Sequence, residues 1–146
     1  MASRALQALL PEADDSHSRL VARALSILGR PELAHLFGPD TRAEVPFLAN
    51  AARDGKPIKL AGRIDRLVVG SDHVLVVDFK SDANPVLDPG RVPAAYLAQL
   101  GLYALVAGQL FPHLEVRAAI LWTSLESLLE LPREALAGAA SAFTMR

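Results

Sequence analysis

Residues 58–80 constrain the fold most strongly, because they contain two runs of strand-forming residues separated by a short polar turn. The first run, residues 58–69, is long enough for an extended strand. The second, residues 73–80, is rich in valine and ends in Asp78-Phe79-Lys80. Gly70-Ser71-Asp72 between them are residue types that favour tight turns. The sequence therefore predicts an antiparallel hairpin.

A helix, a short turn, a strand and a loop are expected before this hairpin. A helix capped by Ser16 is predicted by apolar residues at a 3.6-residue period, with Gly29 placed to end it; these residues are Leu20, Val21, Ala24, Leu25 and Leu28. Pro31 then opens a short turn through Phe37. A strand is expected at residues 43–48, where Pro46 favours an edge or an irregular point, and a polar loop at residues 50–57.

After the hairpin, prolines and Gly90 predict a loop over residues 81–92. A helix beginning at Pro93 and running to residue 110 is apolar nearly all round, as expected for a helix packed between a sheet and other elements. A buried strand at residues 116–123, a pairing segment at 128–131 and a last helix at 132–143 follow. The order α-β-β-β-α-β-α predicts an α/β (α+β) fold with a mixed central sheet flanked by helices.

Composition limits both the architecture and the chemistry. A chain of 146 residues that is 51% hydrophobic can form one domain, residues 1–146, but is too short for two. It has no cysteine, so any metal needs oxygen or imidazole ligands. The net charge of −1 gives no bulk sign of nucleic-acid affinity. No segment has the roughly 18 uninterrupted apolar residues of a membrane span, so we expect a cytoplasmic protein.

The hairpin also carries the candidate chemistry. Side chains two apart on a strand share a face, so Asp78 and Lys80 project together at a spacing of about 6.6 Å. Asp65 on the partner strand can come to lie beside Asp78. Two close carboxylates repel unless a cation lies between them, and Mg²⁺ accepts carboxylate oxygens. An ammonium such as that of Lys80 can orient a water and offset negative charge.

A plainer interpretation is that Asp65 and Lys80 are exposed strand-end residues that pair with Arg63 or Arg66, because a D-x-K triplet is common. The balance is shifted by Gln99 and Tyr103, which lie four residues apart on an otherwise apolar helix. They share one helix face and can meet the same cleft.

Together these motifs resemble the PD-(D/E)XK nuclease superfamily, and within it the RecB-type branch. The resemblance rests on Asp65 in a Gly-x-x-Asp strand, on Asp78-Phe79-Lys80, and on Gln99-Leu100-Gly101-Leu102-Tyr103. Further segments are similar to the C-terminal nuclease domain of the AddA family: Leu36-Phe37-Gly38-Pro39, Arg42-Ala43-Glu44-Val45-Pro46-Phe47, Tyr96-Leu97-Ala98-Gln99 and Leu121-Trp122-Thr123. The resemblance covers residues 24–143.

The resemblance implies a restriction-endonuclease-like core. It also implies that the chain is the exonuclease domain of a deoxyribonuclease. This enzyme would use Mg²⁺, for which Mn²⁺ can substitute. The resemblance further implies DNA as substrate and a role in double-strand break repair with the helicase portion of AddA and an AddB-like subunit. Asp65 and Asp78 would bind the metal, with the Phe79 carbonyl as a further possible ligand, and Lys80 would be the catalytic lysine.

Three more positions carry an implied role. Glu44 matches a family glutamate that holds a water or a metal ligand, although it can equally be a surface residue paired with Arg42. Gln99 and Tyr103 would support the site or contact the DNA backbone.

The chain departs from the family in two respects. RecB-type nucleases place a histidine in an upstream Gly-x-x-x-His setting, and residues 4–10 resemble the segment just after it, so the N-terminal helical part is expected to be incomplete. Neither His17 nor His35 has that context. No Gly-x-x-x-x-Gly-Lys-Ser/Thr motif is present, so a motor would have to come from other sequence. Two alternatives stay open: a catalytically inert module that docks on DNA or a partner, and a stand-alone RecB-like nuclease.

Overall fold

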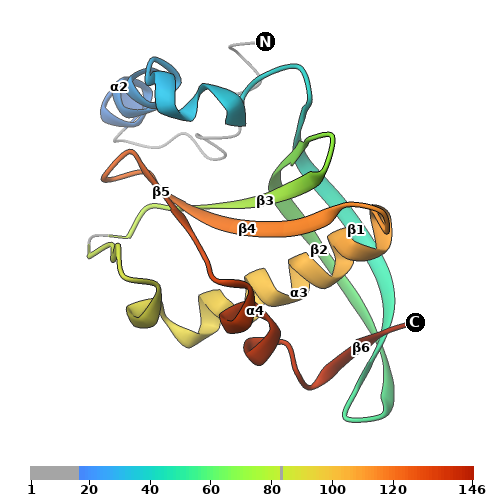
Figure 1. Ribbon diagram of the computed structural model, residues 1–146. Coiled ribbons are helices and arrows are strands. Elements are labelled where there is room, and N and C mark those ends of the chain that lie inside the picture. The colour runs from blue at the N-terminus through green and yellow to red at the C-terminus, as the bar shows by residue number, and fades with distance from the viewer. Residues whose placement is uncertain (1–16, 83) are drawn as a thin grey trace.

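The computed structural model describes residues 17–82 and 84–146, and within them one mixed six-stranded sheet flanked by helices (Figure 1). The strands are β1 (Thr41–Arg53), β2 (Lys56–Val69), β3 (His73–Lys80), β4 (Glu115–Trp122), β5 (Ser127–Glu130) and β6 (Phe143–Met145). Their spatial order is β5-β4-β3-β2-β1-β6, with β3 and β4 parallel and the other pairs antiparallel. The mixed α/β fold and the hairpin predicted from the sequence are confirmed.

Helices cover both faces of the sheet (Figure 1). They are α2 (His17–Leu28), α3 (Ala94–Leu110) and α4 (Arg133–Ala139), with short 3₁₀ helices η1 (Pro31–Leu36) and η2 (Pro89–Arg91). Helix α3 connects the parallel strands β3 and β4, as a crossover helix must. Among the residues 17–82 and 84–146, no helix is long and apolar enough to cross a membrane.

Two hydrophobic clusters sandwich strands β3 and β4. On the α3 side, Val74 and Val76 pack with Leu100 and Ile120. On the other side, alternate residues of the same strands pack with Ile27 of α2 and Leu36 of η1; the strand residues are Leu75, Val77, Ala119 and Leu121. Burial on both faces explains why these two strands read as continuous apolar runs.

Strand β2 changes the face it presents at Asp65. Ile64 lies in the cluster on the α3 side, whereas the Arg66 guanidinium donates to the Leu36 carbonyl on the η1 side at 2.7 Å. Residues two apart normally share a face. The position opposite Asp65 is Glu44 on β1, which has a left-handed φ of 48°. Glu44 and Asp65 do not pair, although the residues on either side of them do. Asp65 therefore sits at a break in the alternation, and β2 pairs with β3 only from Arg66 onwards.

The prediction of a polar loop at residues 50–57 is wrong. Strands β1 and β2 continue to a two-residue turn at Asp54-Gly55, where φ is 50° and 83°. Two central residues with positive φ match the twist of a hairpin, and Asp-Gly is a sequence that favours this turn. At Pro46, β1 is an edge strand among the described residues, because it pairs there with β2 and β6 pairs with β1 only at Ala51–Arg53.

Two helix predictions need correction. The last helix ends at Ala139, and Phe143–Met145 form strand β6, whose partner is a distant segment of β1. Among the side chains of α2 that the structure describes, Ala24 and Ile27 are buried, while Leu25 is 57% exposed. Ser16, the expected cap, lies outside the described residues.

Candidate active site

Asp65 bridges the gap that opens where β2 leaves β3. Its Oδ2 accepts a hydrogen bond from the Phe79 backbone N–H at 2.8 Å. The side chain thus takes the place of a ladder hydrogen bond beyond the last pair, Arg66 and Val77. This contact fixes the Asp65 carboxylate at the end of β3, next to Asp78.

Asp78 and Lys80 share one face of β3, as the strand period predicts. Asp78 is 3% exposed, and Lys80 Nζ lies 2.8 Å from Asp78 Oδ2. This contact is an ion pair without hydrogen-bond geometry, so the buried Oδ2 has a charged neighbour but no aligned hydrogen-bond donor among the described residues. A carboxylate has further lone pairs, so Asp78 can bind a cation as well as pair with Lys80.

Helix α3 supplies the next contacts of the lysine. Lys80 Nζ donates to Gln99 Oε1 at 2.9 Å, and Gln99 Nε2 donates to the Tyr103 hydroxyl at 3.0 Å. The Tyr103 ring packs edge-to-face on Phe47 of β1, with centroids 5.6 Å apart. Sheet and helix therefore hold Asp78, Lys80, Gln99 and Tyr103 in one connected chain.

The electrostatics are those of crowded, partly desolvated charges. Burial raises the pKa of Asp65 to about 7; the Phe79 N–H opposes this shift and the neighbouring Asp78 carboxyl adds to it. For Lys80, burial acts to lower the pKa, but the close Asp78 carboxylate outweighs it and the pKa is raised. Lys80 is therefore a cation at neutral pH, whereas Asp65 exchanges its proton near neutrality.

The residues present fit a hard divalent cation. Asp65 and Asp78 offer carboxylate oxygens, and a cation between them would offset both the burial of the Asp65 charge and the repulsion from Asp78, which together raise the pKa of Asp65. Within the described part of the chain no group of three or more histidine, cysteine or acidic residues could hold a metal. Two carboxylates with waters and substrate phosphates suffice for Mg²⁺.

Glu44, the remaining predicted position, lies opposite Asp65 on β1 but makes its ion pair with another residue. The Glu44 side chain is about half exposed, and its partner is Arg63, with Oε1 and Nη1 3.9 Å apart, rather than Arg42. Among the described residues, Glu44 forms no ion pair with Lys80, whose partners are Asp78 and Gln99. His35 is exposed in the last turn of η1, and the side chain of His17 lies outside the described residues.

Sequence reasoning missed one contact of the lysine. The Tyr96 ring lies under Lys80 Nζ, 4.3 Å from centroid to nitrogen, and the Tyr96 hydroxyl donates to Asp82 Oδ2 at 2.7 Å. The sequence spacing could have predicted this contact, because Tyr96, Gln99 and Tyr103 recur at i, i+3 and i+7 and so share one face of α3.

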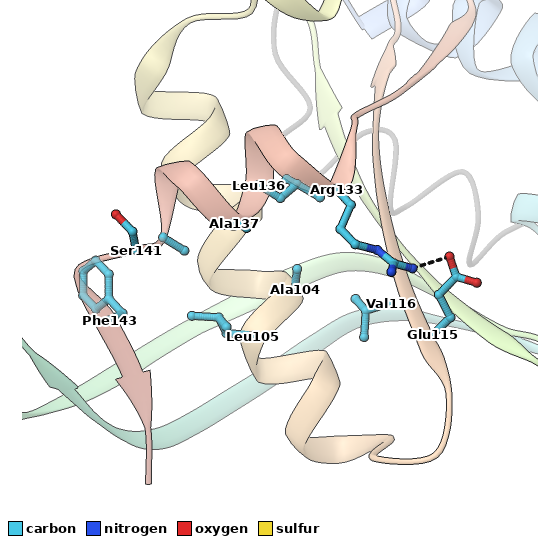
Figure 2. A pocket seen from close by; sticks show the side chains of 11 residues that line it. Ala104, Leu105, Glu115, Val116, Arg133, Leu136, Ala137, Ser141 and Phe143 are labelled. Carbon is cyan, nitrogen blue, oxygen red and sulfur yellow. Dashed lines mark hydrogen bonds and ion pairs between the residues drawn. The ribbon is translucent and has the colours of Figure 1, made fainter.

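A cavity of about 750 Å³ lies elsewhere, between α3, α4 and β4 (Figure 2). Its walls are mostly apolar, with Leu105, Val116 and Leu136 among the lining residues, and Arg133 forms an ion pair with Glu115 across one side at 2.6 Å. It contains none of the residues around Lys80, so the candidate site is the surface where β2 and β3 diverge.

The fold is a mixed sheet whose central hairpin presents two carboxylates and a lysine, residue types that can serve metal-assisted hydrolysis. The family described as "PD-(D/E)XK nuclease superfamily" matches residues 1–139. The chain belongs to this superfamily, whose members are typically nucleases that use divalent metal ions. The restriction-endonuclease-like core predicted from the sequence is thereby confirmed.

The remaining comparisons add little. No curated protein matches the chain. Among solved structures, one titled "Crystal structure of SSO0001" is 17% identical, with a TM-score of 0.44, over 96% of this chain and 81% of that one.

Proposed function

We propose that this chain is a Mg²⁺-dependent deoxyribonuclease domain of the RecB type that hydrolyses DNA phosphodiester bonds. The observation that carries the proposal is the assembly of Asp65, Asp78 and Lys80 where β2 and β3 diverge. We further propose, from the sequence resemblance, that it acts as an exonuclease in double-strand break repair with a helicase portion of AddA type and an AddB-like subunit.

The residues have separate tasks in this proposal. Asp65 and Asp78 hold the metal, with the Phe79 carbonyl as a further ligand. When bound, the ion supplies positive charge that polarises a phosphate oxygen and lowers the pKa of water. Lys80, held toward Asp78 by Gln99 at 2.9 Å, orients the attacking water and offsets charge that develops on the phosphate.

Cleavage of linear DNA with Mg²⁺ by Asp78→Asn and Lys80→Gln variants tests the proposal. We expect each to lose activity by about 100-fold or more, as when a charge-stabilising group is removed from an active site. Glu134→Gln is the matched control, because it neutralises an exposed carboxylate on α4 and should cleave at the parental rate. A folded Asp78→Asn protein with parental metal-dependent cleavage would overturn the mechanism.

A second candidate is a catalytically inert module that docks on DNA or a partner subunit. It is favoured by the small ligand set, since the described residues offer two carboxylates here and no cluster of three ligands. Calorimetric titration with Mn²⁺ separates the candidates. Binding below millimolar concentrations supports the nuclease, and its absence supports the docking module.

A further inference from the structure

Tyr96 contacts the lysine at the first turn of α3. Its ring face lies 4.3 Å from Lys80 Nζ, within the range of a cation–π interaction. Together with Asp78 Oδ2 at 2.8 Å and Gln99 Oε1 at 2.9 Å, the ring is a third neighbour of the ammonium. The ammonium thus has an anion, an amide oxygen and an aromatic face around it.

The ring itself is held from two sides. The Tyr96 hydroxyl donates to Asp82 Oδ2 at 2.7 Å, and its ring packs against buried Trp122, with centroids 6.2 Å apart. Asp82 is in turn fixed, because its backbone carbonyl accepts from the Ser124 hydroxyl at 3.1 Å. Tyr96 therefore presents a fixed surface to the lysine.

A lysine side chain has four rotatable methylene bonds, so its ammonium reaches many positions unless neighbours exclude them. Asp78 and Gln99 attract the ammonium by charge and by a hydrogen bond. In the proposed nuclease, Asp78 also holds the metal and shares its charge with it. The aromatic face, like the Gln99 hydrogen bond, is a contact of Lys80 that involves no proposed metal ligand.

We propose that Tyr96 is a positioning residue for Lys80. Its ring confines the ammonium to the side of Asp78 and Gln99, and Asp82 fixes the ring. This proposal rests on the proposed nuclease function for its effect on catalysis, but the confinement of Lys80 is a property of the protein alone.

The first test is an NMR measurement on the protein alone and needs no DNA cleavage. The chain has only three lysines, so their signals can be assigned individually. In protein labelled with ¹³C at lysine Cε, the ring current of Tyr96 should shift the Lys80 methylene protons upfield of exposed Lys56 and Lys59. Lys80→Gln assigns the signal by its loss. We expect the shift to vanish in Tyr96→Leu and to persist in Tyr96→Phe. A Lys80 signal at the position of the exposed lysines in the parent protein would overturn the proposal, even if Tyr96→Leu does not fold.

The second test measures DNA cleavage. We expect Tyr96→Leu to lower kcat about tenfold and to change KM for DNA less than about twofold, as loss of a desolvated cation–π contact predicts. Tyr96→Phe keeps the ring and should retain activity within about threefold. Phe111→Leu removes an aromatic ring at the far end of α3, about 22 Å away along the helix, and should match the parent.

Two results would contradict the proposal: parental kcat in a folded Tyr96→Leu protein, or an equal loss in Tyr96→Phe, which would assign the effect to the hydroxyl. Failure of the nuclease function looks different. In that case the parent protein shows no cleavage that Lys80→Gln abolishes, while the lysine signal still decides whether Tyr96 confines Lys80.

Discussion

At the scale of single residues, Asp65 is the position where function opposes stability. Its folded pKa of about 7 exceeds the value of about 3.9 in an unfolded chain, because burial disfavours the carboxylate. The folded protein therefore binds the proton more tightly than the unfolded chain. The contribution of Asp65 to stability is fully present below about pH 4 and is lost as pH rises through about 7.

We predict that Asp65→Asn stabilises the metal-free protein at pH 8 by about 1–2 kcal/mol, a figure reduced from the full shift because partial exposure lets solvent screen the charge. Asparagine keeps an acceptor for the Phe79 N–H. Urea denaturation at pH 4, 6 and 8 measures the difference, which should shrink toward pH 4. A difference that does not vary with pH would contradict a raised pKa.

At the scale of elements, the packing of α3 on α4 depends on Gly101. A Cβ placed there would lie 2.8 Å from the Leu136 carbonyl oxygen and 3.1 Å from Ala140 Cβ. On the same helix, a Cβ at Gly108 would lie no closer than 3.8 Å to its nearest neighbour, Val116 Cγ2. The two glycines thus have the same helical setting and different surroundings.

We predict opposite effects of alanine at these positions. Gly101→Ala should destabilise the protein by about 1–3 kcal/mol, because backbone atoms of α4 must move. Gly108→Ala should stabilise it by about 0.5–1 kcal/mol through helix propensity. Denaturation midpoints of both variants measure this. Equal stabilisation by both would show that α4 does not pack closely on α3.

Elements with a strong local pattern were predictable from sequence, and those that depend on a distant partner were not. The valine-rich run at His73–Lys80 has the predicted bounds, because burial on both faces demands continuous apolar residues. Strand β6 has three residues and exists through its pairing with Ala51–Arg53, which no local pattern around Phe143 reveals.

The site divides in the same way. A period of two placed Asp78 and Lys80 together, and a helical period placed Gln99 with Tyr103. The reversal of faces at Glu44 and Asp65 could not be predicted, because a glutamate with φ of 48° breaks the alternation that pattern reading assumes.

At the scale of the whole molecule, the candidate metal site is tied to the main core. Strand β3 carries Asp78 and lies between the two hydrophobic clusters, and Asp65 joins β2 to β3 through the Phe79 N–H. A ligand that bridges Asp65 and Asp78 therefore binds only the folded sheet. Such binding stabilises the whole protein by linkage.

We predict that Mn²⁺ at 100 times its dissociation constant stabilises the protein by about 2.7 kcal/mol at pH 8 and raises Tm by about 5–10 °C. At pH 5.5 and the same Mn²⁺ concentration, the rise in Tm should be much smaller, because a proton on Asp65, whose pKa is about 7, competes with the metal. Scanning calorimetry measures both. Asp78→Asn should abolish the shift, whereas Glu134→Gln should retain it. If Mn²⁺ leaves the Tm of the parent protein unchanged at pH 8, Asp65 and Asp78 do not bind the metal. The argument for a metal-dependent nuclease would then fail.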